Sequence, residues 1–169
     1  MKRILFIGDV VGKAGCNFVS AKLGMIKQHY GVDITVINGE NSAQGNGISR
    51  ASAQQLVRAG ADVITTGNHA FRRKNDLDIF EEDYIIRPAN YPEGGCIGRG
   101  VCTLDMGAYS IAVVNLMGTV YMDQLDNPFT KERIADLKLS DSSLSISGNM
   151  PSHPRHIVNP HTGTFVEDK

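Results

Sequence analysis

The sequence predicts a layered α/β domain, and two regularities in its first two thirds support that prediction. Short runs of β-branched or other apolar residues alternate with segments whose apolar residues recur at helical spacing. Short polar segments that contain glycine follow the first three apolar runs, as expected where buried strands end in turns. This alternation is typical of βαβ units built around a mostly parallel sheet.

Four apolar runs are the expected strands of that sheet. They are ILFI at 4–7, ITVI at 34–37, VITT at 63–66 and YIIR at 84–87. Each run is four residues long and rich in residues that favour strands.

Helical patterns occupy the intervals between these strands. Val19, Leu23, Ile26 and Tyr30 recur on one face, so we expect a helix over 14–30 that Gly31 ends. A second helix should begin after the N-cap Ser49, turn Ala53, Leu56 and Val57 inward, and end before Gly60. A shorter and more polar helix is expected within 74–83.

The next segment has the pattern of an antiparallel hairpin. GVCTLDM and YSIAVVNLM are separated by Gly107 and Ala108, a short connection of the kind that joins neighbouring antiparallel strands. The second of these strands is almost continuously apolar, and we therefore expect it to be buried.

The composition divides the chain into a domain at 1–138 and a tail at 139–169. KERIADLKL, just before the boundary, could form one more helix, whereas the tail is rich in Ser, Pro, His and Asn. With few apolar residues to bury, the tail is expected to be irregular or disordered. The abrupt change is what a truncated, frameshifted or otherwise altered reading frame would produce.

Composition also limits the class of partner. The chain has 169 residues, 41% of them hydrophobic, and a formal net charge of −1, which fits one globular domain and argues against a general nucleic-acid surface. We find no apolar run long enough to span a membrane, and the start does not match a secretory signal, so we expect a cytoplasmic protein with a small-molecule partner. Its three cysteines lack the spacing of a disulfide framework or zinc site and are expected in the core.

Chemically active side chains follow each of the first three strands. Asp9 lies in GDVVG, Glu40 and Asn41 lie in NGEN, and Asn68 and His69 lie in GNH. Because the carboxyl ends of parallel strands meet at one edge of a sheet, these five side chains should converge there. Carboxylate, amide and imidazole groups suit Mn²⁺, Fe or Zn²⁺, and one carboxylate can bridge two cations. NGEN alone is more often a turn, but three such loops in register favour a metal site.

An ordered series of motifs gives the chain a resemblance to a known family. FIGDVVG, VINGENSAQGNGIS, ITTGNHAF, IRPANYPEG and VVNLMG together resemble the calcineurin-like metallophosphoesterases, in the YmdB-type branch of 2′,3′-cyclic-nucleotide phosphodiesterases. The similarity covers roughly residues 1–135. It implies a β-sandwich flanked by helices, so that some of the expected strands belong to a second sheet.

The resemblance also implies roles for the same five residues. Asp9 and Glu40 would bind a dinuclear centre of Fe or Mn, with Zn as an alternative, and Glu40 would bridge the two ions. Asn41 would belong to the same centre and Asn68 would bind the second metal. His69 would donate a proton to the leaving group while a metal-activated water attacks the phosphodiester.

The sequence departs from the family pattern in its last part. Family members carry further histidines, including a G-T-H-T-H segment, that complete both coordination spheres, and neither segment is present here. His153, His156 and His161 are the alternative nitrogen donors, although nearby prolines prevent a regular helix on which a His-x-x-His pair would chelate. We therefore expect weakened metal binding and uncovered apolar surface that favours homo-oligomers.

Two other functions are consistent with parts of the pattern. The chain could be a non-catalytic metal- or nucleotide-binding module that acts through association with another chain. A flavodoxin- or Rossmann-like nucleotide binder is disfavoured because GDVVG lacks the G-x-G-x-x-G spacing.

Arg72, Arg73 and Lys74 could reach a substrate phosphate, but a run of this kind is more often a solvated helix start. IRPAN should shape the cleft wall, with Arg87 in a structural ion pair.

Overall fold

The computed structural model describes residues 2–92, 95–120, 122 and 125–128, together with the strand positions 156–158 and 165–167. Its elements, in chain order, are β1 (Ile4–Ile7), α1 (Gly12–Tyr30), β2 (Ile34–Asn38), α2 (Arg50–Ala59), β3 (Val63–Thr65), η1 (Lys74–Glu81), β4 (Ile85–Ile86), β5 (Val101–Asp105), β6 (Ser110–Val114), β7 (His156–Val158) and β8 (Phe165–Glu167).

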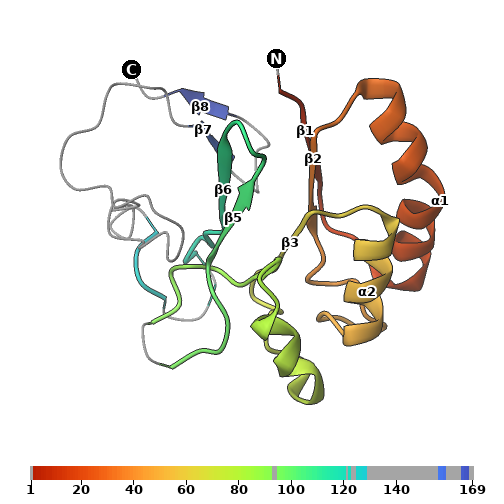
Figure 1. The fold of residues 1–169 in the computed structure, drawn as a ribbon. Coiled ribbons are helices and arrows are strands. Elements are labelled where there is room, and N and C mark those ends of the chain that lie inside the picture. Colours follow the sequence, from red (N-terminus) through yellow and green to blue (C-terminus); the bar gives the residue numbers. More distant parts are fainter. Residues whose placement is uncertain are drawn as a thin grey trace.

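The first four strands form one parallel sheet in the order β1-β2-β3-β4. Because parallel crossovers are right-handed and each strand here pairs with the next one in the chain, successive connections stay on the same face of the sheet. α1 and α2 lie on that face, and the β5-β6 hairpin lies on the other (Figure 1). The structure thus has the two sheets and the helical layer of the expected sandwich, and the carboxyl ends of its parallel strands share one edge.

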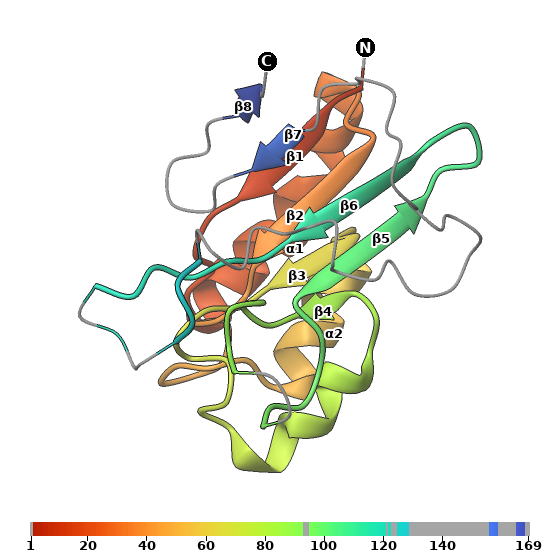
Figure 2. The ribbon, with the colours of Figure 1, turned by 90° about the vertical axis from the view of Figure 1, so that its left-hand side faces the viewer.

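Side chains alternate along the parallel strands between two cores. Leu5, Ile37 and Ile64 pack with the helices, whereas Val36 and Val63 pack towards the second sheet. The second core also contains Cys102, Leu104, Ile111 and Val113 of the hairpin. The hairpin lies over the parallel sheet, as Figure 2 shows from the hairpin side. A sheet with apolar residues on both faces needs both covering layers, which explains the near-continuous apolar character of its strands.

The helix ends follow the glycine and serine signals of the sequence. α1 ends at Gly31, whose φ of 59° and ψ of 49° are left-handed, and α2 ends at Gly60 with a φ of 114°. Ser49 caps α2 through a reciprocal pair of hydrogen bonds with Ser52. α1 begins at Gly12, two residues before the expected start, and its expected apolar face is wrong at Tyr30, which is 58% exposed.

The short helix expected within 74–83 is present and is a 3₁₀ helix. Two further expectations differ from the structure. Strand β6 is only partly buried, because just one of its faces meets the sheet, so the expectation of full burial is wrong. Arg87 makes no ion pair within the described residues and instead donates to the carbonyl oxygens of Ile97 at 3.3 Å and Pro88 at 2.9 Å. Cys16 and Cys102 are buried as expected, and Cys96 is only partly so.

Two short strands lie in the stretch for which composition predicts irregular structure. β7 and β8 pair antiparallel, and β7 also contacts β6. The expected helix near 131–139 and the remaining tail positions lie outside the described residues, as do the side chains of His153, His156 and His161. The domain boundary at 138 therefore stays a prediction.

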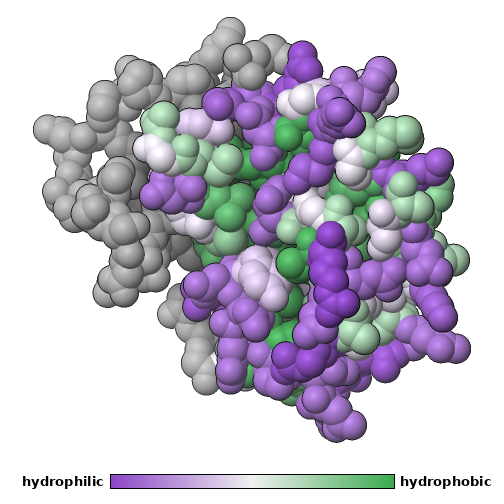
Figure 3. Space-filling model, turned by 45° about the vertical axis from the view of Figure 1, so that its right-hand side comes forward, coloured by the Kyte–Doolittle hydropathy of each residue, from purple (hydrophilic) through white to green (hydrophobic). Residues whose placement is uncertain are grey.

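The face seen in Figure 3 is mainly polar, with pale and deep green apolar residues scattered among the purple polar ones. Val11, Phe18 and Met25 are exposed apolar residues on or just before α1. Within the described residues, no helix combines the length and apolar character needed to cross a membrane.

Candidate metal and phosphoester site

Backbone hydrogen bonds join the three loops that follow β1, β2 and β3. The amide of Val10 donates to the carbonyl of Asn38 at 3.0 Å, and that of Gly12 donates to the carbonyl of Asn41 at 2.8 Å. The amide of Gly39 donates to the carbonyl of Thr65 at 3.0 Å. These bonds continue the strand pairing past the ends of the strands, and so fix the loops against one another.

The Glu40 carboxylate is held over the loop that follows β3. The His69 amide donates to its Oε2 at 3.2 Å, and the Asn38 side chain donates to its Oε1 at 3.4 Å. A Cβ atom placed on Gly67 would lie 2.6 Å and 2.7 Å from the two carboxylate oxygens, far inside van der Waals contact. Only glycine at position 67 allows the carboxylate to sit so close to this backbone.

Asn41 connects two of the other predicted site residues. Its Nδ2 donates to Asp9 Oδ2 at 2.8 Å, and its Oδ1 lies 2.6 Å from His69 Nδ1. The opposite amide orientation would place the Asn41 oxygen against a carboxylate oxygen, so the network fixes the assignment. Because an amide oxygen only accepts, Nδ1 of His69 carries the proton in this bond, and Nε2 is the ring atom left for other chemistry.

The turn that carries Asn68 and His69 is anchored to the helical core. Ala70 donates to the carbonyl of Gly67 at 3.1 Å, and the Phe71 ring packs 5.3 Å from the ring of Phe80, which is 1% exposed. The Asn68 side chain is partly exposed and makes no hydrogen bond to any described residue. The structure therefore brings Asp9, Glu40, Asn41 and His69 together through hydrogen bonds, with Asn68 beside them in the same turn.

Two residues that position this site had no role in the sequence prediction. Asn38 supports Glu40 from both sides, since its Oδ1 also accepts from the Glu40 amide at 3.0 Å. Asn115, just after β6 and 3% exposed, donates to the carbonyls of Thr66 at 2.6 Å and Ile86 at 3.2 Å, and so ties the second sheet to the ends of β3 and β4. Their presence in the NGEN and VVNLMG motifs is the signal that could have pointed to them.

The donor types fit a divalent cation. Asp9 and Glu40 supply carboxylate oxygens, and Asn41 and Asn68 supply amide oxygens. The close approach of Glu40 to Gly67 leaves a carboxylate at the convergence of the three loops, where a cation would offset its charge. Within the described residues no group of three or more His, Cys, Asp or Glu side chains is arranged to hold a metal ion. These residues thus supply oxygen ligands, and not the nitrogen ligands that the resemblance implies.

Fold and site together define a class of protein. A helix-covered parallel sheet packed on a second sheet, with acid and amide groups at the carboxyl ends of its strands, is the metallophosphoesterase sandwich. Within that class, the chain belongs to the family of YmdB-like proteins, whose family model matches residues 5–146.

Comparisons with individual proteins agree with this assignment. The chain is 41% identical over 130 residues to a 2′,3′-cyclic-nucleotide 2′-phosphodiesterase of Bacillus subtilis, covering 76% of this chain and 49% of that protein. A crystal structure of a Thermus thermophilus protein superposes with a TM-score of 0.70 at 41% identity, covering 76% and 50% of the two chains. The structure of a novel phosphatase from Mycoplasma pneumoniae gives 0.75 at 32% identity, covering 82% and 51%. The chain spans about half the length of these relatives.

Proposed function

We propose that the chain carries the oxygen-ligand half of a metal-dependent phosphodiesterase site that hydrolyses small phosphodiesters such as 2′,3′-cyclic nucleotides. The observation that supports this most directly is the convergence of Asp9, Glu40, Asn41 and His69, from three strand ends, in one hydrogen-bonded group. The name of the Bacillus subtilis relative supports the substrate class.

Asp9, Glu40, Asn41 and Asn68 are the residues that would hold the metal ions. The proposed metals are Fe and Mn, with Zn as the alternative, and among these Mn²⁺ is the ion that oxygen donors suit best. Asn41 Oδ1 has two lone pairs, and only one of them faces His69. The oxygen could therefore accept the hydrogen bond from His69 and bind a cation at the same time. When bound, the metals would activate a water molecule for attack and neutralise charge on the phosphate.

His69 would donate the proton that the leaving oxygen requires. Its Nδ1 proton is engaged with Asn41, so the proton that reaches the leaving oxygen would be the one that Nε2 carries when the ring is in its doubly protonated, imidazolium form. Histidine is suited to this role because, among the side chains, it is the one that most readily gains and loses a proton near neutral pH. General acid catalysis of this kind contributes about 10²–10⁴-fold to the rate.

A non-catalytic metal- or nucleotide-binding module is the second candidate. It rests on the same oxygen donors, Asp9, Glu40 and Asn41, which could bind a cation without carrying out hydrolysis. A half-site of this kind could bind metal weakly and act through association with another chain. The expected cytoplasmic location and homo-oligomer stay predictions under both candidates.

Metal content and turnover of the purified chain separate the two functions. Hydrolysis of adenosine 2′,3′-cyclic phosphate and of bis(p-nitrophenyl) phosphate would be measured with Mn²⁺, alongside metal analysis by mass spectrometry. Turnover that Glu40→Gln abolishes supports the phosphodiesterase, and the exposed Glu81→Gln is the matched control. Stoichiometric metal without turnover supports the module, and absence of both metal and turnover contradicts both.

A further inference from the structure

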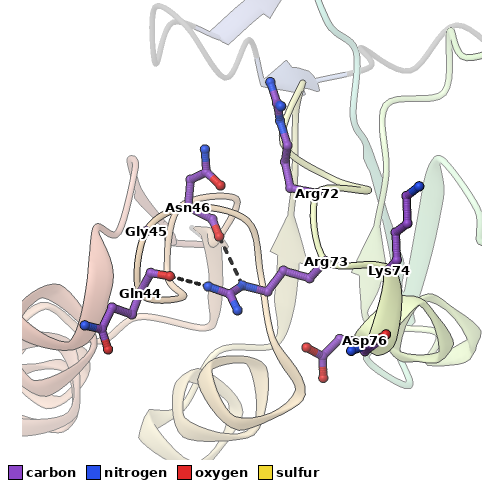
Figure 4. A pocket seen from close by; sticks show the side chains of 8 residues that line it. Gln44, Gly45, Asn46, Arg72, Arg73, Lys74 and Asp76 are labelled. Carbon is purple, nitrogen blue, oxygen red and sulfur yellow. Dashed lines mark hydrogen bonds between the residues drawn. The ribbon is translucent and has the colours of Figure 1, made fainter.

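Beyond the metal site, the loops that follow β2 and β3 continue and line an open hollow of about 530 Å³. One wall consists of Gln44, Gly45 and Asn46, and the other runs from Arg72 to Asp76 (Figure 4). Volumes of 300–1,000 Å³ are typical of small-molecule sites. The hollow lies outside the set of residues assigned to metal binding and proton transfer.

The two walls are direct extensions of the proposed catalytic loops. Gln44 follows Asn41 by three residues, and the Arg72 amide donates to the carbonyl of His69 at 3.2 Å. The hollow is therefore joined to the loop that carries His69, so one molecule could occupy the hollow and reach His69.

Arg73 holds the two walls together. Its Nε donates to the carbonyl of Asn46 at 3.1 Å, and its Nη2 donates to the carbonyl of Gln44. Its side-chain stem packs against Gly47, where a Cβ would lie 3.1 Å from Arg73 Cγ. Gly47 also has a φ of 79°, a left-handed value that favours glycine. Arg73 thus holds the wall at residues 44–46 in place, and its positively charged guanidinium lies beside the hollow.

Arg72 and Lys74 have no partner among the described residues. Both side chains are exposed and make no ion pair or hydrogen bond there. In Figure 4 the Arg72 side chain extends from its loop to the same side as the amide of Asn46. The guanidinium of Arg72 is therefore available to a phosphate group at the rim of the hollow, which Arg72 helps to line.

The lining is locally cationic in a chain whose net charge is −1. The lining contains three cationic residues, Arg72, Arg73 and Lys74, and one carboxylate, Asp76, which accepts from the Arg50 amide at 3.3 Å. A cationic hollow confined to these residues suits one or two phosphate groups and not an extended nucleic-acid backbone.

We propose that this hollow binds a second phosphate of the substrate, carried on the same molecule as the scissile phosphodiester. The substrate class is then a nucleotide with two phosphate groups, the second recognised by Arg72 with Lys74. The inference rests on the proposed function, because it places the scissile group beside Glu40 and His69. The second phosphate could be a 5′-phosphate on the same nucleoside or the internucleotide phosphodiester of an oligoribonucleotide.

Kinetics with three substrates test the preference. They are adenosine 2′,3′-cyclic phosphate, its 5′-phosphorylated form, and the dinucleotide ApA ending in a 2′,3′-cyclic phosphate. The wild-type chain should show a KM about 10-fold lower for a substrate with the second phosphate, the effect of roughly one charge-assisted contact. Arg72→Ala should remove that advantage and Arg72→Lys should keep part of it, whereas the exposed Arg58→Ala should retain it. The 5′-phosphorylated and dinucleotide arms show which source of phosphate is preferred.

Two kinetic results would overturn the proposal. Equal KM values for all three substrates in the wild type would show that a second phosphate adds nothing. An increase in KM in Arg72→Ala that is the same for all three substrates would show that Arg72 contacts only the cyclic nucleotide that they share.

A binding measurement keeps the subsite separate from the proposed function. Titration calorimetry would compare adenosine 3′,5′-bisphosphate with adenosine 5′-monophosphate, neither of which contains a phosphodiester bond. Tighter binding of the bisphosphate that Arg72→Ala abolishes supports the subsite even when no substrate is turned over. Indistinguishable affinities for the two compounds would overturn it, whatever the catalytic activity.

Discussion

Asn41 Oδ1 accepts a hydrogen bond from Nδ1 of His69 across 2.6 Å, while the other end of the same amide donates to Asp9 at 2.8 Å. One amide thus links the loops after β1, β2 and β3. It also selects the tautomer of His69, since the Nδ1 proton is needed for this bond. Proton transfer and metal binding are therefore coupled through Asn41 in the proposed site.

Replacing His69 by alanine should reduce hydrolysis in a way that depends on the leaving group. For adenosine 2′,3′-cyclic phosphate, whose leaving group is a ribose oxygen, kcat should fall about 10²–10⁴-fold. The loss should be much smaller for bis(p-nitrophenyl) phosphate, because nitrophenolate leaves without a proton. Steady-state kinetics on both substrates check this, with the exposed His29→Ala as the matched control. Equal losses on both would show that His69 is not the acid.

Removing the side chain of Asn41 should release the ring of His69 from its fixed tautomer. In Asn41→Ala neither His69 nor Asp9 retains its amide partner. The loops after β1 and β3 therefore lose the hydrogen bonds that join them to the Asn41 side chain. Nitrogen NMR of the histidine rings, recorded on the neutral ring, should show only the Nδ1-protonated tautomer of His69 in the wild type and a mixture of the two tautomers in the variant. An unchanged His69 signal in the variant would contradict the positioning role.

Gly67→Ala should disable the site while leaving the fold intact. The new Cβ would overlap both oxygens of Glu40, and a flexible side chain can move aside more easily than the backbone can. We expect metal content and turnover to fall at least about 10-fold, with little change in the thermal unfolding midpoint. Gly24→Ala is the control, since a Cβ there meets nothing within 4 Å. A variant that unfolds, or one that keeps full metal content, would be against this reading of Gly67.

Alkaline pH should weaken the fold through Cys102. Burial, reinforced by Asp83, raises the pKa of the Cys102 thiol above its ordinary value of 9.0. The folded state then keeps a proton that the unfolded state releases, so this stabilisation is complete below pH 9.0 and declines as pH rises through the folded-state pKa. Urea denaturation should show a fall in unfolding free energy as the pH rises above 9.0, and a smaller fall in Cys102→Ala. An identical pH dependence in both proteins would remove Cys102 as a cause.

Much of the secondary structure could be predicted from short-range sequence patterns. Gly31 and Gly60 end the two helices as predicted, and Ser49 caps the second one, because capping depends on residues a few positions apart. The convergence at the strand ends is also predictable, since it follows from the parallel topology that the alternation of strands and helices indicates.

Burial on the second sheet was harder to predict. The apolar residues of β6 look like those of a buried strand, and only the packing shows that one face of the hairpin meets the parallel sheet. The sequence pattern shows which residues are apolar enough to be buried. It does not show whether one or both faces of the strand will be covered by other elements.

The order of the elements, the glycine and serine positions that end and begin the helices, and the side chains at three strand ends can all be predicted from the amino-acid sequence. Three relationships appear only in the folded chain: Glu40 lies against Gly67, Asn41 joins Asp9 to His69, and Arg73 connects two loops. The reason is range: capping and periodicity act within a few residues, whereas these contacts join groups 27 to 32 positions apart that meet only after the sheet has formed.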